Sequence, residues 1–542
     1  MKRITIKILA AAICAVMLPV MAAGCGTFTP HSDKTQVYVS VMNGGFGIKW
    51  AEEAAKRFVQ RPGYEGYEIK VVANEDLGDE MIAAIDAGTN LYNACFISHT
   101  GIGNLINRDY LLDLTSYLDK KIVDSENKTL GQKLLNSELY EQAYGKYYSG
   151  GLYALPYGDN FAGFVFDFDT FKAKGWLRES SPGVLAPGPS GIAGNYDEGQ
   201  PRSMTEWNDM INLIKAEANS YAYIYTTYFP LYLDQVIDAV FAQYAGLEEY
   251  EAFTEFNGTI TDRSNSAVNV TPAEGYKVFE AQGLYKAAEF FYENLTASGA
   301  SVHPLSLGTT GTTHRDAQNS FIMGNYNRSA STPLGAMLVE GVWWENESRA
   351  IFNAFDNRGE YEYGFGKRDY RYMLFPKMAG QKGIDGHGNG SVLQIMETGS
   401  SFVIKSGNED IDRVAADFLV YTASDEILKY YTLSTGGIRP FDYDLTPVEK
   451  GTMTKFQQNV WDIYHDTENI AFIRPNVASA LQPIHRFGSR KGRYNSLINS
   501  VPYEYPLQAL SRFNAEEFFA GLKTRNQTNW SKWYNEVKQY YE

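Results

Sequence analysis

The sequence predicts an α/β protein that folds into two or more lobes. Its 542 residues exceed the length that one hydrophobic core normally serves. Between residues 36 and 97, apolar residues form strand-like patterns in three segments and helical patterns in the two segments between them. In chain order these segments are 36–42, 48–60, 67–73, 77–87 and 94–97. This alternation is typical of an α/β lobe with a largely parallel sheet.

Further elements follow a connecting segment. Residues 180–202 are rich in Pro, Gly and Ser, which predicts an exposed connection. Ser203 and Glu206 then fit a capping box and predict the start of a helix. Later predicted elements are a strand at 401–404 and helices at 411–419 and from 424 onward.

The chain begins with the features of a secretory signal peptide. Three basic residues precede an uncharged apolar run of 16 residues, Ile8–Ala23, and small residues lead into Cys25. The layout resembles a bacterial lipobox, in which the cysteine thiol is acylated, for example with palmitate. The alternative is an uncleaved anchor, but that needs about 20 apolar residues, and Pro19 breaks this run. We expect a signal peptide at 1–24, a lipidated Cys25 with a tether over 25–35, and a cell-membrane protein on the extracytoplasmic face.

The charge of the mature chain excludes several kinds of partner. Without the three basic residues of the signal peptide, 45 Lys and Arg remain against 64 Asp and Glu, and the net charge is −19. Nucleic acids and anionic lipid surfaces are not attracted to such a field. We therefore expect no nucleic-acid partner and membrane contact by the lipid anchor only.

Cysteine, histidine and glycine patterns do not indicate catalysis or a cofactor. Of three cysteines, only Cys95 lies outside the signal peptide and the lipobox, which excludes a disulfide framework and a zinc cluster. His-Glu-x-x-His, P-loop and Gly-x-Ser-x-Gly motifs are absent, and the seven histidines lack metal-ligand spacing. We expect no catalytic residue, metal or cofactor. A glycoside hydrolase stays open, because two suitably spaced carboxylates suffice for that reaction.

Aromatic residues are abundant, with 39 Tyr, 30 Phe and 8 Trp, or 14% of the chain. Tyr and Trp combine an apolar ring face with a polar edge. This combination suits sugar rings, whose C–H faces stack on aromatic rings while their hydroxyls form hydrogen bonds. For any single ring, a place in the hydrophobic core is the alternative.

Several short motifs occur in a fixed order along residues 36–440. They are Tyr153–Tyr157, Val165–Phe171 with Gly175, Met204–Trp207, Phe321–Gly324, Ala336–Met337, Gly341–Trp343 and Gly436–Pro440. Together, behind a lipobox, these motifs resemble the extracellular solute-binding proteins (family 1 type) that serve carbohydrate ABC transporters. Asp167 stands where that family usually has Asn.

The resemblance implies a two-lobed, hinged, periplasmic-binding-protein-like α/β fold with a cleft between the lobes. The first lobe is expected to contain 36–157 plus 376–436, and the second 158–375 plus 437–542. Such a protein is expected to be a monomer without enzymatic activity, which captures a carbohydrate, in particular an oligosaccharide, and delivers it to the permease subunits of an ABC importer. Two alternatives remain open: a secreted glycoside hydrolase, and a binding protein for a peptide or another non-sugar solute.

Trp343, Trp344 and Glu345 form the strongest candidate constellation for ligand binding. Two adjacent tryptophans offer a stacking platform, and the carboxylate next to them can accept hydrogen bonds from hydroxyls. The resembled family commonly places a ligand-facing Trp at this position. We expect one of the two tryptophans to contact ligand, without preferring either.

The other candidates lie where the chain is expected to leave strands or to cross between lobes, because ligands of open α/β sheets bind beyond the carboxyl ends of strands. In chain order these candidates are Asn43, Trp50, Tyr157, Asp159, Asn160 and Arg439. Each has a structural alternative: Asn43 can form part of a turn, Trp50 can belong to the core, and Arg439 can form an inter-lobe salt bridge. Tyr157, Asp159 and Asn160 can instead be solvated residues at the surface of the hinge.

Overall fold

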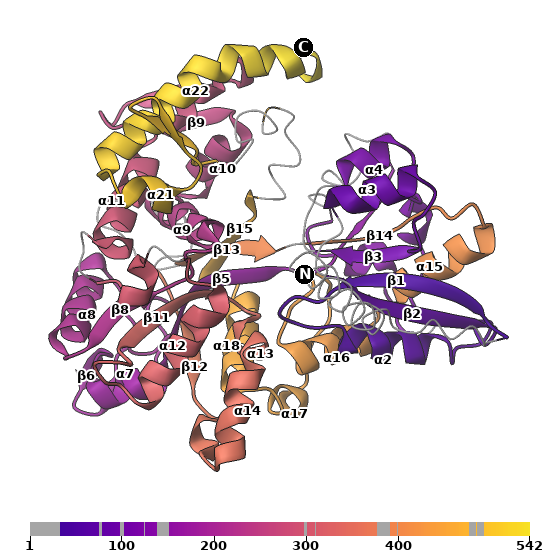
Figure 1. Ribbon diagram of the computed structural model, residues 1–542, viewed down its shortest axis with the longest axis horizontal. Coiled ribbons are helices and arrows are strands. Elements are labelled where there is room, and N and C mark those ends of the chain that lie inside the picture. The colour runs from indigo at the N-terminus through magenta and orange to yellow at the C-terminus, as the bar shows by residue number, and fades with distance from the viewer. Residues whose placement is uncertain are drawn as a thin grey trace, which may run out of the picture.

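Two β-sheets, each with its own helices, form the two lobes of the molecule (Figure 1). The structure is a computed structural model and describes residues 33–74, 78–97, 102–123, 125–137, 151–297, 301–308, 311–376, 391–397, 399–475, 484 and 493–541. The predicted signal peptide and Cys25 lie outside these residues. Every helix within the described ranges is too short or too polar to cross a bilayer.

The sheet of the first lobe has the strand order β2-β1-β3-β14-β4. Its strands are β1 (Thr35–Met42), β2 (Tyr67–Asn74), β3 (Ala94–Ile97), β4 (Leu155–Pro156) and β14 (Ser400–Val403). β1 pairs in parallel with β2 and β3, whereas β14 runs antiparallel to β3. The helices of this lobe are α2 (Lys49–Phe58), α3 (Gly78–Asp86), α4 (Gly103–Asn107), α5 (Leu130–Lys133), α15 (Glu409–Tyr421) and α16 (Asp425–Thr435). The strands and helices predicted for 36–97 and 401–424 are confirmed.

The sheet of the second lobe has the order β15-β13-β5-β11-β8, and β12 pairs with the carboxyl-terminal half of β5. Its strands are β5 (Asn160–Asp167), β8 (Ser220–Ile224), β11 (Leu334–Gly341), β12 (Tyr370–Met373), β13 (Ser391–Glu397) and β15 (Ile470–Ile473). Every residue of β5 and β11 is buried. Both strands are therefore covered on both faces, as expected for the centre of an α/β sheet.

Helices and small hairpins surround this second sheet. The helices are α7 (Phe168–Lys174), α8 (Met204–Ala216), α9 (Asp234–Ala245), α10 (Leu247–Glu255), α11 (Gln282–Leu295), α12 (His314–Tyr326), α13 (Trp344–Glu347), α14 (Arg349–Arg358), α17 (Pro447–Lys450), α18 (Lys455–His465), α21 (Pro506–Leu510) and α22 (Ala515–Val537). The hairpins are β6 (Glu179–Ser181) with β7 (Val184–Leu185), β9 (Gly258–Thr261) with β10 (Ala267–Val270), and β16 (Ser496–Ile498) with β17 (Val501–Tyr503).

The predicted start of α8 is confirmed, with one difference in the cap. The Ser203 side chain accepts a hydrogen bond from Glu206 N, as in an N-cap. The Glu206 carboxylate, however, accepts from Arg202 N at 2.6 Å and also pairs with Arg178, so the reciprocal half of the capping box is replaced by contacts to the segment before the helix.

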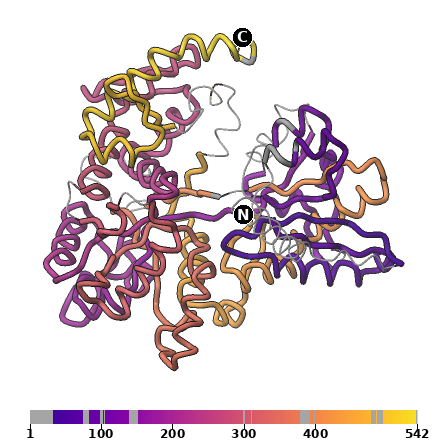
Figure 2. Tube along the Cα trace, in the orientation of Figure 1, coloured from indigo at the N-terminus to yellow at the C-terminus, as the bar shows by residue number. Residues whose placement is uncertain are grey.

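The chain passes between the lobes three times (Figure 2). It crosses from β4 to β5, from β13 to β14, and after α16 toward α18. We expected the first lobe to resume at residue 376, but Ser391–Glu397 pairs with β5 and belongs to the sheet of the second lobe. The second crossing therefore follows Glu397. An apolar strand buried on both faces does not indicate which of two sheets it joins, so local pattern alone misplaced this boundary.

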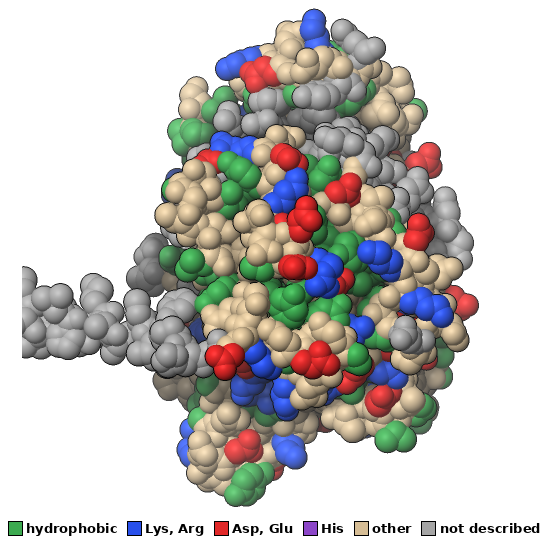
Figure 3. All heavy atoms as spheres, turned by 90° about the vertical axis from the view of Figure 1, so that its right-hand side faces the viewer, with side chains coloured by type: hydrophobic (Ala, Val, Ile, Leu, Met, Phe, Trp, Pro, Cys, Tyr) green, Lys and Arg blue, Asp and Glu red, His purple; other side chains and the backbone are tan. Residues whose placement is uncertain are grey.

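The outer end of the first lobe carries no single dominant charge. Figure 3 shows acidic and basic side chains interspersed with small apolar patches over this face. The first lobe also forms surface ion pairs such as Arg57–Glu426 and Lys70–Glu68.

Candidate functional site

The ends of both sheets that carry the crossings lie where the lobes meet. In the first lobe, the parallel strands β1 and β3 end at Met42 and Ile97. In the second lobe, Gly341 at the carboxyl end of β11 pairs with Ala162 near the start of β5. Because β5 begins directly after the first crossing, the carboxyl ends of β11 and of its parallel neighbour β8 lie at the crossing edge. This is the edge at which ligands of open α/β sheets bind.

The lobes touch at this edge through Gly45 and Trp343. The Asn346 side chain donates a hydrogen bond to Gly45 O at 2.6 Å. A Cβ atom placed on Gly45 would lie 2.4 Å from the Cβ of Trp343, so only glycine fits. The glycines after β1 were expected to allow a close approach to ligand; here the close approach of Gly45 is to Trp343.

Trp343 lies at the surface where the lobes meet. Its ring lies over Gly341, where a Cβ would come within 2.3 Å of the ring. Tyr232 packs edge-on against the ring at 6.0 Å. Trp343 is 7% exposed. Its ring thus packs between two glycines and Tyr232, next to the first lobe.

Trp344, by contrast, belongs to the core of the second lobe. It is fully buried, and its ring makes edge-to-face contacts at 5.0–6.0 Å. The four rings around it come from different elements: Phe321, Phe352, Tyr370 and Phe456. The sequence left open whether Trp344 contacts ligand or belongs to the core, and the structure places it in the core.

Glu345 is also buried and connects two helices. Its carboxylate accepts a hydrogen bond from the Thr454 hydroxyl at 2.6 Å, and Thr454 is the N-cap residue of α18. Burial raises the pKa of Glu345 to about 7. The residue is 1% exposed, which places its carboxylate away from any solute.

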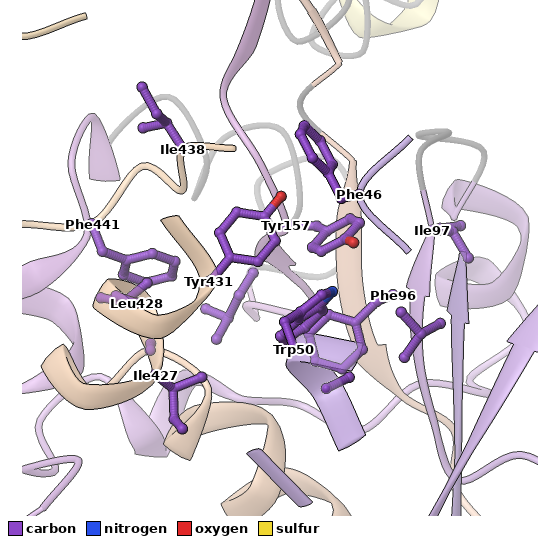
Figure 4. Close-up of a cluster of buried hydrophobic side chains, with 14 of the residues drawn as sticks. Phe46, Trp50, Phe96, Ile97, Tyr157, Ile427, Leu428, Tyr431, Ile438 and Phe441 are labelled. Atoms are coloured by element: carbon purple, nitrogen blue, oxygen red, sulfur yellow. The ribbon is translucent and has the colours of Figure 1, made fainter. Parts of the chain in front are cut away.

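Trp50 is enclosed by other rings beneath the edge of the first lobe (Figure 4). Phe96 and Tyr431 each lie edge-on at 5.3 Å, and Tyr157 stacks on it at 5.8 Å. Trp50 is 1% exposed, so the core alternative holds for it. Phe46, in the loop after β1, packs edge-on against Tyr431 and joins this cluster to the crossing edge.

Asp159 and Asn160 hold the first crossing in place. The buried Asp159 carboxylate accepts hydrogen bonds from Arg474 at 2.5 Å and from the Tyr464 hydroxyl at 2.8 Å. Asn160 Oδ1 accepts from Ile438 N at 3.3 Å, and Asp159 N donates to Ile438 O at 2.8 Å. These bonds tie the first crossing to the third.

Arg439 joins the same crossings from within the protein. It is fully buried, and it donates to Tyr157 O at 3.1 Å, to Thr422 O at 2.6 Å and to the Thr422 hydroxyl at 3.1 Å. No carboxylate of the described residues forms an ion pair with it, so the inter-lobe salt bridge that the sequence left open as the alternative is not formed. Burial lowers the pKa of Arg439 to about 10.

Asn43 is an exposed polar residue at the crossing edge of the first lobe. Its backbone N–H donates a hydrogen bond to Asn74 O at 2.8 Å, and the residue is exposed to solvent. Tyr157 lies at the same edge and is 5% exposed. Of the nine candidates, Asn43, Tyr157 and Trp343 are thus those that lie at the meeting edges rather than wholly inside a lobe.

Sequence reasoning missed an aromatic row that continues from Trp343. We use this name for Trp343, Tyr232, Phe229 and Tyr228, whose successive ring centroids are 6.0, 6.3 and 4.8 Å apart. The last three residues follow the carboxyl end of β8, and Tyr228 is 62% exposed. The signal that could have found them was the aromatic run at 228–232, which follows β8, a strand that the sequence analysis did not predict.

Comparison with known proteins was informative only at the level of structure. No protein-family model matches the chain, and no curated protein matches it in sequence. The unliganded RafE structure from Streptococcus pneumoniae matches 92% of this chain and 98% of its own, with 13% identity and a TM-score of 0.55. A chitin oligosaccharide binding protein matches 92% and 100%, with 15% identity and a TM-score of 0.55. A protein of xylan utilization from Caldanaerobius polysaccharolyticus matches 90% and 99%, with 13% identity and a TM-score of 0.57.

The chain has the two-lobed fold of the solute-binding proteins. The predicted fold class is therefore confirmed. At these identities the similarity concerns the fold, and it extends over nearly the whole length of each solved structure.

Among the residues that the structure describes, no group of three His, Cys, Asp or Glu side chains is placed to hold a metal ion. Cys95 is buried, and its burial raises the pKa of the thiol, so it is a core residue and not a nucleophile. What remains at the crossing edge is a row of aromatic rings with polar groups beside it.

Proposed function

We propose that this protein is a lipid-anchored extracytoplasmic solute-binding protein that captures a carbohydrate, in particular an oligosaccharide, for an ABC importer. The observation that carries the proposal is the aromatic row at the edge where the lobes meet. Rings of this kind offer apolar faces to the C–H faces of sugars. Among the structural neighbours are RafE with raffinose, GacH of Streptomyces glaucescens with acarbose, and a Listeria monocytogenes protein with cycloalternan.

The proposed site takes residues from both lobes. Trp343, Tyr232, Phe229 and Tyr228 would line the side of the second lobe, and Asn43 and Tyr157 the side of the first. The six other candidates would not contact the ligand. Trp50 and Trp344 are core residues. Glu345 stabilises α13, and Asp159, Asn160 and Arg439 stabilise the crossings through hydrogen bonds.

Binding would work by a shift between open and closed arrangements of the lobes. A ligand that touches both lobes favours the closed arrangement by its higher affinity for that state. Polar groups at the edge would select among sugars, since a buried polar group left unpaired costs about 1–3 kcal/mol. The closed protein would then dock on the permease subunits as a monomer, without chemical change of the sugar.

A thermal-shift screen of the mature chain against monosaccharides, oligosaccharides and peptides tests the proposal. A ligand at 100 times its dissociation constant stabilises the folded state by about 2.7 kcal/mol, which raises the melting temperature. We expect a rise with one class of oligosaccharide, and recovery of that sugar intact.

Two variants and two outcomes sharpen the screen. Trp343→Ala should lose the ligand-induced rise, whereas Tyr361→Ala, which removes a 65% exposed tyrosine outside the aromatic row, should keep it. Cleaved sugar would indicate a glycoside hydrolase instead. If only peptides raise the melting temperature, the protein does not bind a carbohydrate, but a role as a solute-binding protein in uptake still stands.

A further inference from the structure

Three of the four rings of the aromatic row lie on the loop that follows β8. Tyr228 is 62% exposed, and Phe229 and Tyr232 are partly exposed. Rings at the surface bury less apolar area than core rings, so packing alone does little to fix them. Other contacts must therefore hold the backbone of this loop if the rings are to keep one arrangement before a ligand binds.

Three threonines join the start of this loop to the segment before α12. The carbonyl oxygen of Thr312 accepts hydrogen bonds from the backbone N–H groups of Thr227 and Tyr228, each at 2.9 Å. The same oxygen accepts from the Thr226 hydroxyl at 2.8 Å. In return, Thr312 N donates to the Thr227 hydroxyl at 2.8 Å. We call Thr226, Thr227 and Thr312 the threonine clamp.

The hydroxyl of Thr226 links the threonine clamp to the aromatic row. It accepts a hydrogen bond from Phe229 N at 3.4 Å while it donates to Thr312 O. One hydroxyl can donate and accept at the same time, and a valine side chain can do neither. Thr226 is 1% exposed, so a ligand does not touch it. Any effect of Thr226 on binding must therefore pass through the loop.

The segment on the other side of the threonine clamp is itself fixed. Thr313 is the N-cap residue of α12 and forms a capping box with Asp316. The Thr312 hydroxyl donates to Leu305 O at 2.6 Å. α12 packs against β11, the strand that leads to Trp343. The threonine clamp thus connects the outer rings of the row to the elements that position its inner ring.

Two rings of the row also rest on this segment. Gly311 lies beneath Tyr228, since a Cβ atom placed on this glycine would be 3.5 Å from Cδ2 of the tyrosine ring. The centroid of the His314 ring lies 5.6 Å from that of Phe229. The segment 311–314 therefore supports both the backbone of the loop and its rings.

We propose that Thr226 is a positioning residue, which holds Tyr228 and Phe229 in the arrangement that binds the ligand. A site that is ordered beforehand avoids the entropy cost of ordering it on binding. When only a fraction of the molecules has the competent arrangement, the apparent dissociation constant rises in inverse proportion to that fraction. This inference rests on the proposed function, because the row must contact a sugar, but the hold of Thr226 on the loop can be measured without ligand.

Thr226→Val and Thr226→Ser test the role of the hydroxyl. Valine removes the hydroxyl and keeps the shape, whereas serine keeps the hydroxyl. For the sugar with the largest rise in the thermal-shift screen, we expect Thr226→Val to weaken binding about tenfold, which corresponds to about 1.4 kcal/mol, and Thr226→Ser to bind like the wild type. In a background with both Tyr228→Ala and Phe229→Ala, the valine substitution should have no further effect on affinity.

Hydrogen exchange in the ligand-free protein separates this inference from the proposed function. Mass spectrometry of peptides that cover 225–232 reports local opening of the loop. We expect exchange there to be about tenfold faster in Thr226→Val, with peptides from β11 unchanged, and to keep the wild-type rate in Thr226→Ser. Thr254→Val is the matched control, because it removes a buried hydroxyl of α10, which donates to Glu251 O at 3.0 Å, and should leave exchange in 225–232 unchanged.

Wild-type exchange in Thr226→Val, or equal losses of affinity in Thr226→Val and Thr226→Ser, would overturn the inference. The same holds for an undiminished effect of Thr226→Val when both rings are absent. If the wild-type protein binds no sugar, the proposed function fails, and exchange alone decides whether Thr226 holds the loop. Should Thr226→Val not fold, Thr227→Val replaces it in both measurements with Thr227→Ser as its counterpart, because Thr227 supplies the acceptor for Thr312 N.

Discussion

Alanine substitution at Trp344 and at its neighbour Trp343 should produce opposite phenotypes. Trp344 is fully buried among four rings at 5.0–6.0 Å, which come from α12, α14, β12 and α18. Replacement of a buried tryptophan by alanine costs about 3–5 kcal/mol. Each lost aromatic pair adds about 0.5–1.5 kcal/mol, so we expect a value at the upper end, about 5 kcal/mol. Total stabilities of about 5–15 kcal/mol make this a severe loss.

Trp343→Ala should instead leave most of the stability and remove binding. Its ring is bordered by two glycines and one tyrosine, so we expect a smaller loss than at Trp344, within the range of about 0.5–3 kcal/mol that is usual for a point substitution. Urea denaturation followed by circular dichroism measures the stability of both variants, and calorimetric titration with the sugar found in the screen measures binding. A Trp344→Ala protein that keeps its stability but loses affinity would refute this assignment of the two residues.

Three further predictions follow from buried groups and from the amino-terminal segment. Arg439→Met removes the donors to two carbonyls, Tyr157 O at the first crossing and Thr422 O at the end of α15. The unpaired acceptors cost about 1–3 kcal/mol each, and relief of the buried charge returns part of that cost, so urea denaturation should show a net loss of about 2 kcal/mol. Unchanged stability would contradict the role of Arg439 in joining these segments. Burial raises the pKa of Glu345 from 4.5 to about 7, so its neutral form stabilises the fold below pH 4.5 and this contribution is lost as the pH rises through 7. Between pH 4.5 and pH 8, the free energy of unfolding of Glu345→Gln should therefore rise by about 3 kcal/mol relative to that of the wild type. Parallel curves of unfolding free energy against pH for the two proteins would contradict this prediction. Cys25→Ser should release the protein from membranes into the soluble fraction on cell fractionation; continued sedimentation with membranes would exclude the lipid anchor.

The sequence predicted the elements whose pattern is local. Alternating apolar residues identified β1, and helical spacing identified α2, because each element turns one face or stripe toward the core of its own lobe. Ser203 identified the start of α8 because an N-cap bonds to a backbone N–H only three residues away. The motifs shared with solute-binding proteins added the two-lobed arrangement, which the solved structures confirm as a fold.

The candidate site was predicted less well than the fold. The region around Trp343 was identified, but the aromatic row beyond it was not, since its members come from segments separated by more than a hundred residues. The second crossing was placed before β13 rather than after it. Composition and spacing do not say which of two sheets a wholly apolar strand will join.

By itself, the sequence determined the α/β class and a chain without metal or nucleotide motifs, because these follow from local pattern and composition. The resemblance to solute-binding proteins added the crossing segments at Tyr157 and Arg439. Only the tertiary structure decided that Trp343 lies at the meeting edge while Trp344 fills the core, and that Arg439 bonds to carbonyls instead of an acid. Adjacent side chains leave the backbone in different directions, and their surroundings are supplied by elements distant in the chain. Burial and hydrogen bonding at such positions are properties of packing, which no short stretch of sequence contains.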